Sequence, residues 1–240
     1  MSGRDLDVNK QEGNREERME IQDIVSNRDT TLSSFMHRFI LIVVLLCGLM
    51  VRFYDLTDPP LDFHPTRQLG SAIVARGMYY QNREDIPAWQ RETAISMWQA
   101  REVYEPRILE WVVAQSYKLF GGENLWIARI YTSIMWVMGG VGLYYLLKRY
   151  ANRNSALVSV ILFLFLPFGV LASRSFQPDP IMIMFLIFAL LGYCRWNEHP
   201  TWKRTLLAGV LGGVAILINP IAVFPLIPCL VGLVLTKMSI

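Results

Sequence analysis

The sequence predicts an all-α integral membrane protein with about six transmembrane helices and a long external loop. Two observations predict this class. Hydrophobic residues make up 53% of the chain, and most of them gather in runs that approach the length of about 20 residues that a helix needs to cross a hydrocarbon core. Basic residues gather in two of the short connections between these runs, which is typical of loops on the cytoplasmic side of a membrane.

The first apolar run extends from Phe35 to Tyr54. Arg52 lies near its end, where a long side chain can extend to the membrane edge. Mostly polar residues precede this run and no small-residue cleavage site follows it, so we expect a retained helix and not a signal peptide. Five more apolar runs complete the six expected crossings: Leu125–Leu147, Ala156–Ala172, Ile181–Tyr193, Leu206–Ile218 and Ile221–Leu235.

The N-terminal segment, residues 1–34, differs in composition from the rest of the chain. It holds five basic and eight acidic residues and few large apolar ones. Such a segment cannot bury enough apolar surface to offset the entropy lost on ordering. We therefore expect a disordered cytoplasmic tail followed by a membrane domain over residues 35–240. The alternative is that residues 12–25 form a short amphipathic helix on the membrane surface.

The placement of basic residues predicts the orientation of the chain. Two short connections carry them: Lys148, Arg149 and Arg153 in one, and Arg195, Lys203 and Arg204 in the other. If these connections are cytoplasmic, the N-terminus is cytoplasmic too, and the segments that hold Asp62 and Asp179 lie outside. We expect a multi-pass protein of the cell membrane.

Net charge and the rarer residue types exclude several classes of function. The formal net charge of +3 is too small to indicate a protein that binds nucleic acid. The three cysteines are far apart and lie in or beside apolar runs, which does not indicate a disulfide framework or a zinc site. No two of the three histidines have the spacing of a metal-binding pair on a helix.

Residues 55–124 form a polar external connection that is too long to be only a link between helices, so we expect function to reside there. Apolar residues at helical spacing predict a helix from about Thr66 to Tyr80. A second helix is predicted within residues 105–122, where Gly121 and Gly122 end the pattern. We expect both to lie along the outer membrane surface. The alternative is a small soluble helical cap that stands off the membrane.

The first candidate site is the stretch DPPLDFHPTRQ, residues 58–68, directly after the first apolar run. It brings Asp58, Asp62, His64, Arg67 and Gln68 together within a segment stiffened by three prolines. This density of ionisable groups suits acid–base chemistry or the binding of a charged headgroup. The alternative interpretation is a polar loop whose aspartates cap the following helix.

The second candidate site is SRSFQPDPIM, residues 173–182, between two apolar runs. Its charged residues are Arg174 and Asp179, and we expect them at the same surface as Asp62. A mutual salt bridge between Arg174 and Asp179 that only closes the loop is the alternative to a functional site.

The order of these features resembles the C-type superfamily of membrane glycosyltransferases, in particular the protein mannosyltransferases and aminoarabinose transferases. Residues 105–150, EPRILEWVVAQSYKLFGG and the span after it, resemble the family's Glu-Pro-Pro-Leu surface helix, its Leu-Phe-Gly turn and the arginine at the start of its second span. Residues 172–196 resemble its Asp-Pro-containing fourth span. The similarity covers roughly residues 35–235.

Two departures from the family pattern affect what is carried over. Where the family usually has an Asp-Glu pair opening the first surface helix, this chain has Arg67-Gln68, as in a subgroup with a His-x-x-Arg-Gln pattern. The catalytic carboxylate is therefore not transferred from that position. Members usually continue for several more spans, so we expect this chain to correspond to the N-terminal part of the family domain.

The resemblance implies transfer of a sugar from a polyprenyl-phosphate donor to an acceptor at the outer face, by an inverting glycosyltransferase with membrane lipid as its other partner. Asp62 is then the expected base or metal-assisting acid, with His64 as its rival. The expected donor-binding residues, which hold the lipid phosphate or orient the groups that do, are Arg67, Gln68, Glu105, Arg174 and Asp179. The sequence leaves open the donor sugar, the acceptor and the cofactor, a divalent metal included.

Two readings from other classes remain open. A transporter half needs polar or broken sequence at membrane depth, which Asn219-Pro220 offers. A non-catalytic lipid-binding scaffold keeps the arginines but needs no base. The distance between Asp62 and Asp179 distinguishes these two classes from the enzyme. A cavity shared by the two residues favours the enzyme, and a wide separation favours the alternatives.

Overall fold

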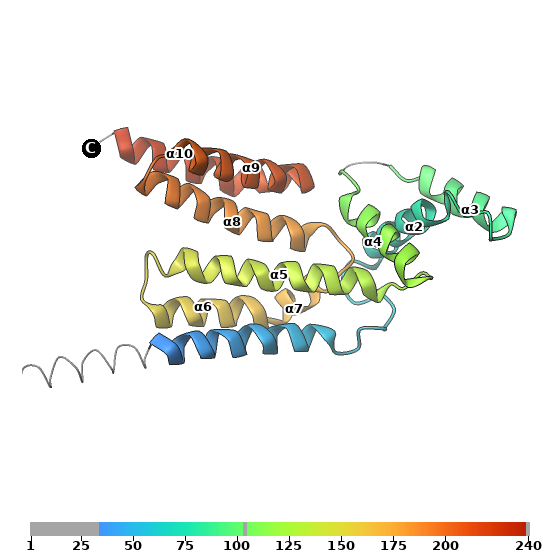
Figure 1. The fold of residues 1–240 in the computed structure, drawn as a ribbon, viewed down its shortest axis with the longest axis horizontal. Helices are drawn as coiled ribbons and strands as arrows, with labels where there is room; N and C mark the ends of the chain where they lie inside the picture. Colours follow the sequence, from blue (N-terminus) through green and yellow to red (C-terminus); the bar gives the residue numbers. More distant parts are fainter. Residues whose placement is uncertain (1–33, 103–104, 239–240) are drawn as a thin grey trace, which may run out of the picture. The chain divides into compact units, whose positions relative to one another are not determined.

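The protein is helical throughout the part that the computed structural model describes, residues 34–102 and 105–238. The predicted tail lies almost entirely outside these residues. Contacts divide the chain into two units, Met1–Val44 and Leu45–Ile240. The apolar helix Ser34–Phe53 begins in the first unit and ends in the second. The remaining elements all belong to the second unit (Figure 1).

Three helices come from the predicted external loop: α2 (Pro65–Tyr80), α3 (Ala88–Gln99) and α4 (Ile108–Phe120). The predictions of α2 and α4 are confirmed, and Gly121 ends α4 with a left-handed φ of 73°. Helix α3 was not predicted. It packs closely on α2, because a Cβ at Gly77 would lie 2.5 Å from Cβ of Trp98.

Helices α2 and α4 share a core with the start of α5. Its buried members are Ala75, Tyr79, Leu109, Val113, Ala114, Tyr117, Ile127, Ala128 and Phe176. Phe176 precedes α8, so the loop before α8 is packed into the same core as the two loop helices. This packing brings the two candidate sites predicted from the sequence next to each other.

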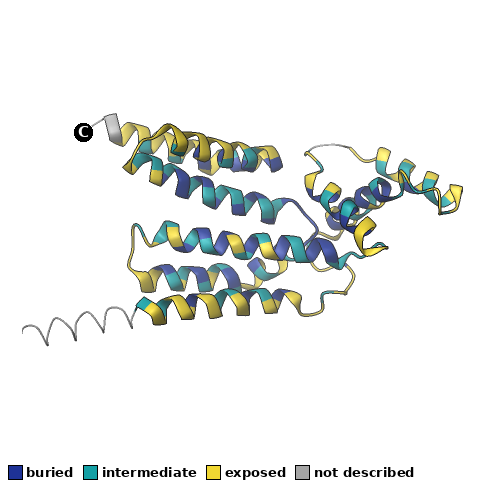
Figure 2. Ribbon diagram, viewed as in Figure 1, coloured by how far each residue is buried: buried dark blue, intermediate teal, exposed yellow. Residues whose placement is uncertain are grey.

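The apolar runs form α5 (Trp126–Leu147), α6 (Arg153–Phe165), α7 (Pro167–Ser173), α8 (Asp179–Glu198), α9 (Trp202–Ile218), the 3-10 turn η1 (Pro220–Ala222) and α10 (Val223–Met238). Helix α5 packs against α6 and α8, and α8 packs against α9. Figure 2 shows buried positions along the facing sides of α5 and α8, where the small residues Gly139 and Gly142 of α5 allow close approach, and Gly192 of α8 does the same toward Ala208 of α9.

In the described ranges, three helices are long and apolar enough to cross a membrane: Ser34–Phe53, Trp126–Leu147 and Asp179–Glu198. The predicted single crossing Ala156–Ala172 is instead a bent pair, α6 and α7, with an angle of 61° between its parts. Pro167 causes the break, because it has no N–H to donate and its ring clashes with a continuing helix. Counting the pair as one crossing gives four, so six crossings are not confirmed.

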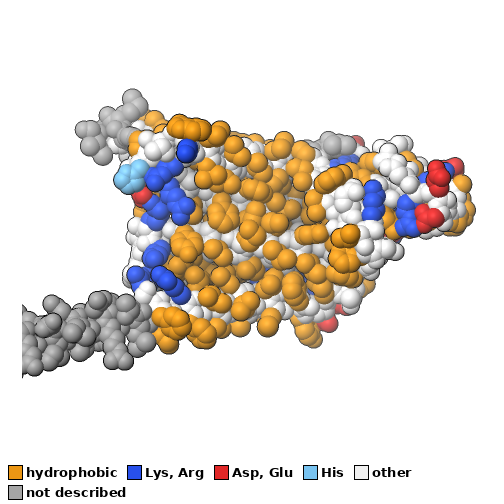
Figure 3. All heavy atoms as spheres, in the orientation of Figure 1, with side chains coloured by type: hydrophobic (Ala, Val, Ile, Leu, Met, Phe, Trp, Pro, Cys, Tyr) orange, Lys and Arg blue, Asp and Glu red, His pale blue; other side chains and the backbone are white. Residues whose placement is uncertain are grey.

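The surface of the bundle is that of an integral membrane protein. Large hydrophobic side chains on its outer helices are exposed, among them Val158, Leu162, Leu207, Val210 and Phe224. Figure 3 shows such side chains covering one face of the bundle, with Lys and Arg gathered at the end where α5 and α8 finish. A patch of this extent on a monomer marks a surface that contacts lipid or another protein.

The two basic connections lie together at that end. Arg149, which follows α5, donates hydrogen bonds to Glu198 at the end of α8, one of them 3.0 Å long. The loop helices α2 to α4 lie at the opposite end, beside the first turns of α5 and α8 (Figure 1). The second unit therefore separates a basic end from the end that holds both candidate sites.

Candidate active site

The loop between the first apolar helix and α2 contains two residues with left-handed backbone conformation. Asp55 has a φ of 46° and His64 has a φ of 47°. Asp and His occupy this region more readily than most residues other than glycine. The turn at Asp55 directs its carbonyl oxygen to two arginines, because it accepts from Nη1 of Arg129 at 3.3 Å and from Nη2 of Arg174 at 2.8 Å.

Asp62 lies between these two arginines. Its Oδ1 is 3.5 Å from Nη2 of Arg129, and its Oδ2 is 4.0 Å from Nε of Arg174. The three residues line a cavity of about 540 Å³ together with Tyr54, Asp55, Asp58, Pro59, Leu61 and Leu171. Nε of Arg174 is buried and has no hydrogen-bond partner among the described residues. An arginine with an unused donor beside a cavity suits an anionic ligand.

Arg129 was not among the predicted site residues. It is 1% exposed, in the first turn of α5. In addition to the carbonyl oxygen of Asp55, its guanidinium donates to the carbonyl oxygens of Leu56 and Pro59, each at 3.2 Å. A charged side chain in an apolar span is costly unless it is paired, and this rule is the signal in the sequence that could have indicated Arg129.

Gln68 lies in the protein interior and supports Asp62. Its Nε2 donates to Oδ1 of Asp62 at 3.3 Å and to the carbonyl oxygen of Phe63 at 2.5 Å. Its Oε1 accepts from the backbone N–H of Phe176 at 3.0 Å. Both ends of the amide are therefore used within the protein, and Gln68 joins the loop of Asp62 to the loop before α8.

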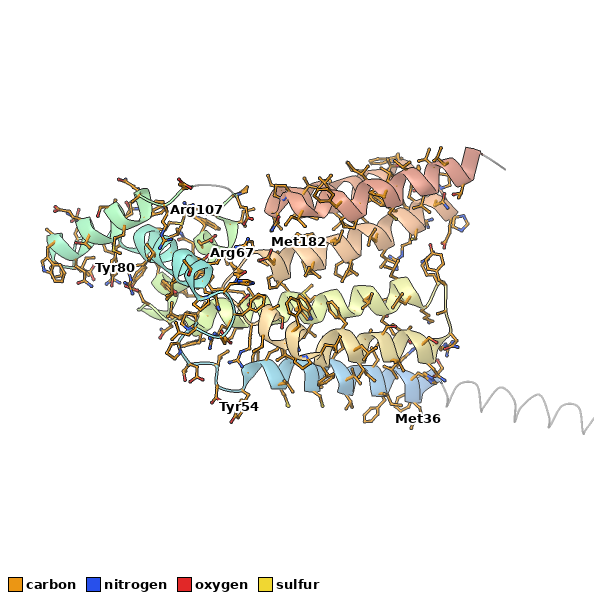
Figure 4. All side chains as sticks on the ribbon, turned by 180° about the vertical axis from the view of Figure 1, so that it is seen from behind. Met36, Tyr54, Arg67, Tyr80, Arg107 and Met182 are labelled. Carbon is orange, nitrogen blue, oxygen red and sulfur yellow. The ribbon has the colours of Figure 1, made fainter. Side chains whose placement is uncertain are left out.

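A second polar network surrounds Arg67, the neighbour of Gln68 on α2. Arg67 donates to Asp179 at 2.9 Å and to Glu105 at 3.1 Å, and its Nη1 lies 3.5 Å from Oε1 of Gln177. Asp179 also accepts from Nδ2 of Asn219 at 3.0 Å. Figure 4 shows Arg67 at the end of α2 that faces α8, with Tyr80 at the other end of α2.

These contacts correct the proposed salt bridge between Arg174 and Asp179. Arg174 pairs with Asp62 and the carbonyl of Asp55, whereas Asp179 pairs with Arg67. The loop 173–179 thus connects to the first candidate stretch at two points, and the two stretches form one polar region. Proximity along the chain misleads here because Arg174 contacts the loop before α2, whereas Asp179 contacts α2 itself.

Arg67 and Glu105 also line a separate cavity of about 470 Å³ between α2 and α4. Glu110 lines it too, although it is only 9% exposed, and its Oε1 accepts a hydrogen bond of 2.8 Å from Ser71. Burial raises the pKa of the Glu110 carboxyl above its ordinary value, because the charged form loses its hydration. Glu110 was not among the predicted site residues.

The predicted base candidates differ in their surroundings. Asp62 lines the 540 Å³ cavity, and Asp179 is not among the residues that line it. The two carboxylates are linked by a chain of hydrogen bonds that runs from Asp62 through Gln68, the carbonyl of Phe63, Gln177 and Arg67 to Asp179. His64 is exposed, with its ring edge against Phe63 at a centroid distance of 4.5 Å.

Metal ligands do not gather at this site. Within residues 34–102 and 105–238 no group of three or more His, Cys, Asp or Glu side chains is placed to hold a metal ion. The positive charges near Asp62 are those of Arg129 and Arg174. The site thus offers two guanidinium groups to an anion and, in Asp62, a carboxylate that can accept a proton beside them.

A multi-span helical bundle with a carboxylate and two arginines at one end defines a membrane enzyme or receptor for an anionic lipid. A comparison with protein families resolves the class. Residues 105–240 match the profile of the dolichyl-phosphate-mannose-protein mannosyltransferases, and the chain belongs to this family of membrane glycosyltransferases with lipid-phosphate-linked sugar donors. The match includes Arg129, Arg174 and Asp179 and begins after the loop of Asp62. No curated protein and no solved structure matches the chain.

Proposed function

We propose that this protein transfers a sugar from a polyprenyl-phosphate donor to an acceptor hydroxyl, with the chemistry at Asp62, Arg129 and Arg174. The observation that carries the proposal is the 540 Å³ cavity in which the carboxylate of Asp62 lies beside two buried or nearly buried guanidinium groups. A lipid phosphate needs cations at the membrane surface, and an acceptor hydroxyl needs a base. The family membership supports this reaction class.

The proposed step is a single displacement that inverts the anomeric carbon. The acceptor oxygen forms a bond to that carbon while the bond from the carbon to the phosphate oxygen breaks. Asp62 takes the hydroxyl proton and becomes a neutral carboxylic acid. The electron pair of the broken bond stays on the phosphate, where a second negative charge develops. Arg174 and Arg129 stabilise this charge through their guanidinium groups.

The other predicted residues take supporting roles in this proposal. Gln68 orients Asp62 through its amide. Arg67, Glu105 and Asp179 form the adjoining ion network, which holds the start of α2 against the start of α8. His64 remains the rival base, and its exposed ring would have to approach the acceptor from outside the cavity. If transfer uses a divalent metal, Asp62 would be a ligand to it, and Asp55 and Asp58 line the same cavity.

We also infer that the site faces the outside of the cell membrane and that the N-terminus is cytoplasmic. The inference is supported by the two basic connections, which lie together at the opposite end of the second unit. Basic residues in short loops favour the cytoplasmic side. A lipid-linked donor would then reach the cavity from the outer leaflet.

The second candidate function is binding of a lipid phosphate without transfer. It is favoured by one observation, because Asp179 is not among the residues that line the cavity of Asp62. The two arginines would bind a phosphate whether or not a base is present. Such a scaffold would require the arginines of the cavity and would tolerate loss of Asp62.

The distinguishing experiment changes only the proton acceptor. Asp62→Asn keeps the shape and the hydrogen bond from Gln68 but cannot take a proton, so we expect transfer from dolichyl phosphate mannose to fall by about 100-fold or more. Binding of polyprenyl phosphate should persist. Asp85→Asn, at an exposed aspartate in the turn after α2, is the matched control and should transfer normally.

The outcome separates the candidates. Retained transfer in Asp62→Asn would remove Asp62 from the chemistry. Loss of transfer in His64→Gln alone would move the base to His64. Absence of transfer in the unaltered chain, together with binding that needs Arg174, would favour the lipid-binding scaffold.

A further inference from the structure

Arg52 does not extend to the membrane edge as its place near the end of the first apolar helix predicts. It is fully buried, with 0% of its surface exposed. Nε donates to Oγ of Ser173 at 2.6 Å, Nη1 donates to the carbonyl oxygen of Gly48 at 2.7 Å, and Nη2 donates to that of Leu164 at 3.0 Å. An arginine held inside a membrane protein needs a reason, because its burial is costly.

The reason lies in the break between α6 and α7. Pro167 has no N–H, so the carbonyl of Phe163 loses the partner that it would have in a continuous helix. The carbonyl of Leu164 loses its partner as well, because the chain turns before residue 168. Two side chains replace these partners: Nε1 of Trp136 donates to Phe163 at 3.2 Å and Arg52 donates to Leu164.

Arg52 therefore stabilises a bend that an apolar environment would otherwise disfavour. Unpaired carbonyl groups at membrane depth cost several kcal/mol each in general. Trp136 contributes in the same way and also stacks on the ring of Phe163 at a centroid distance of 4.6 Å. The bend is thus supported from the first apolar helix and from α5 at once.

The bend determines where Arg174 lies. Helix α7 ends at Ser173, which accepts from Arg52 and donates to the carbonyl of Val170 at 3.0 Å. The next residue, Arg174, then reaches Asp62 and the carbonyl of Asp55. The side chain of Arg52 is therefore hydrogen-bonded to both parts of the broken span, at Leu164 of α6 and at Ser173 of α7. Ser173 is the residue directly before Arg174, which binds the phosphate in the proposed site.

We propose that Arg52 is a positioning residue for the lipid phosphate, acting through α7 and Arg174. The inference rests on the proposed function of the Arg174 site. Arg52 does not line the cavity of Asp62, and its three nitrogens all donate to protein acceptors, so it does not contact the ligand itself. Its contribution to phosphate binding exists only while Arg174 is present.

The test is a double-mutant cycle on the full-length protein in lipid nanodiscs, with polyprenyl phosphate as the probe. Arg174→Gln and Arg52→Gln should each weaken binding about tenfold, which corresponds to loss of one good charge-assisted contact. The double variant should also be weakened about tenfold and not about a hundredfold, because the two changes act on the same contact. Binding of the uncharged polyprenol should be unaffected.

Two further variants keep the test decisive. Ser173→Ala removes only the acceptor of Nε and should weaken phosphate binding about threefold even if Arg52→Gln does not fold. Arg149→Gln, at the basic end of the bundle, is the matched loss of an arginine and should bind normally.

The outcomes distinguish this inference from the proposed function. A double variant weakened about a hundredfold, or normal binding in both Arg52→Gln and Ser173→Ala, would show that Arg52 does not act through Arg174. Normal binding in Arg174→Gln would overturn the phosphate site itself and the role of Arg52 with it.

Discussion

Replacement of Arg129 tests whether the cavity depends on the guanidinium that joins α5 to the loop of Asp62. The side chain donates to the carbonyls of Asp55, Leu56 and Pro59 at 3.2–3.3 Å and lies 3.5 Å from Asp62. Glutamine at this position is too short to reach these acceptors and carries no charge. Lysine keeps the charge but presents its donors from a single nitrogen.

The expected loss follows from these contacts. At such lengths each of the three bonds contributes about 0.5–0.8 kcal/mol, less than the roughly 1.5–3 kcal/mol of a short bond to a charged group. The pair with Asp62, which is 29% exposed, adds about 0.5 kcal/mol because solvent screens it. Arg129→Gln should therefore destabilise the native position of the loop by about 2–3 kcal/mol. At about 1.4 kcal/mol for each factor of ten, this loss lowers kcat/KM by about 30- to 150-fold.

The assay is transfer of mannose from dolichyl phosphate mannose by the full-length protein, with size-exclusion chromatography to verify folding. Arg129→Lys should retain about a tenth of the activity, since it keeps the charge and one or two of the contacts. A folded Arg129→Gln protein that loses less than about threefold would refute the reasoning, as would a lysine variant no better than the glutamine variant.

Two other predictions concern the buried acid and the orientation. Because the pKa of Glu110 is raised in the folded protein, its carboxyl holds its proton to higher pH when folded than when unfolded, so stability falls as the pH rises above the ordinary value of 4.5. Glu110→Gln keeps an oxygen that accepts the hydrogen bond from Ser71 but cannot become charged. It should raise the melting temperature at pH 8 by about 2–4 °C for each kcal/mol that burial of the charge costs, and change it little at pH 4. An equal shift at both pH values would contradict this prediction. In a variant without the native cysteines, Glu92→Cys should react with an impermeant thiol reagent in intact cells and Ala151→Cys should not; labelling at 151 would reverse the orientation.

Sequence patterns predicted the helices whose periodicity comes from burial of one face. Helices α2 and α4 bury residues at helical spacing, and glycine residues end α4. Helix α3 buries only Ala94 within its span, so no periodic signal existed to predict it. Its position depends on the contact between Gly77 and Trp98, which is tertiary information.

The break at Pro167 was visible in the sequence but was read as part of one crossing. An apolar run with a single proline fits a kinked span as well as two separate helices. What decides between them is whether other side chains donate hydrogen bonds to the freed carbonyl oxygens. Arg52 and Trp136 do so from helices far away in the sequence.

The candidate site was predicted at the level of segments and not of pairs. Asp62, Arg67, Arg174 and Asp179 do lie in one polar region, but each carboxylate pairs with the arginine of the other segment. Pairing depends on the core contact at Phe176, which sets the register of the loop before α8 against α2. Gln68 and Arg129 both contact Asp62. These contacts depend on how the helices pack, which residue spacing in the sequence does not reveal.

The two arginines of the cavity are held chiefly by main-chain oxygen atoms of the loop 55–59, and this affects which substitutions the loop can accept. A carbonyl group is present whatever the side chain, so residues 56 and 59 are free to change during evolution without releasing Arg129. Position 55 is restricted instead by its φ of 46°, which admits Gly, Asn and Asp and disfavours β-branched residues. Substitutions at positions 56 and 59 can therefore change the side chains around the opening of the cavity while Arg129 and Arg174 keep their positions.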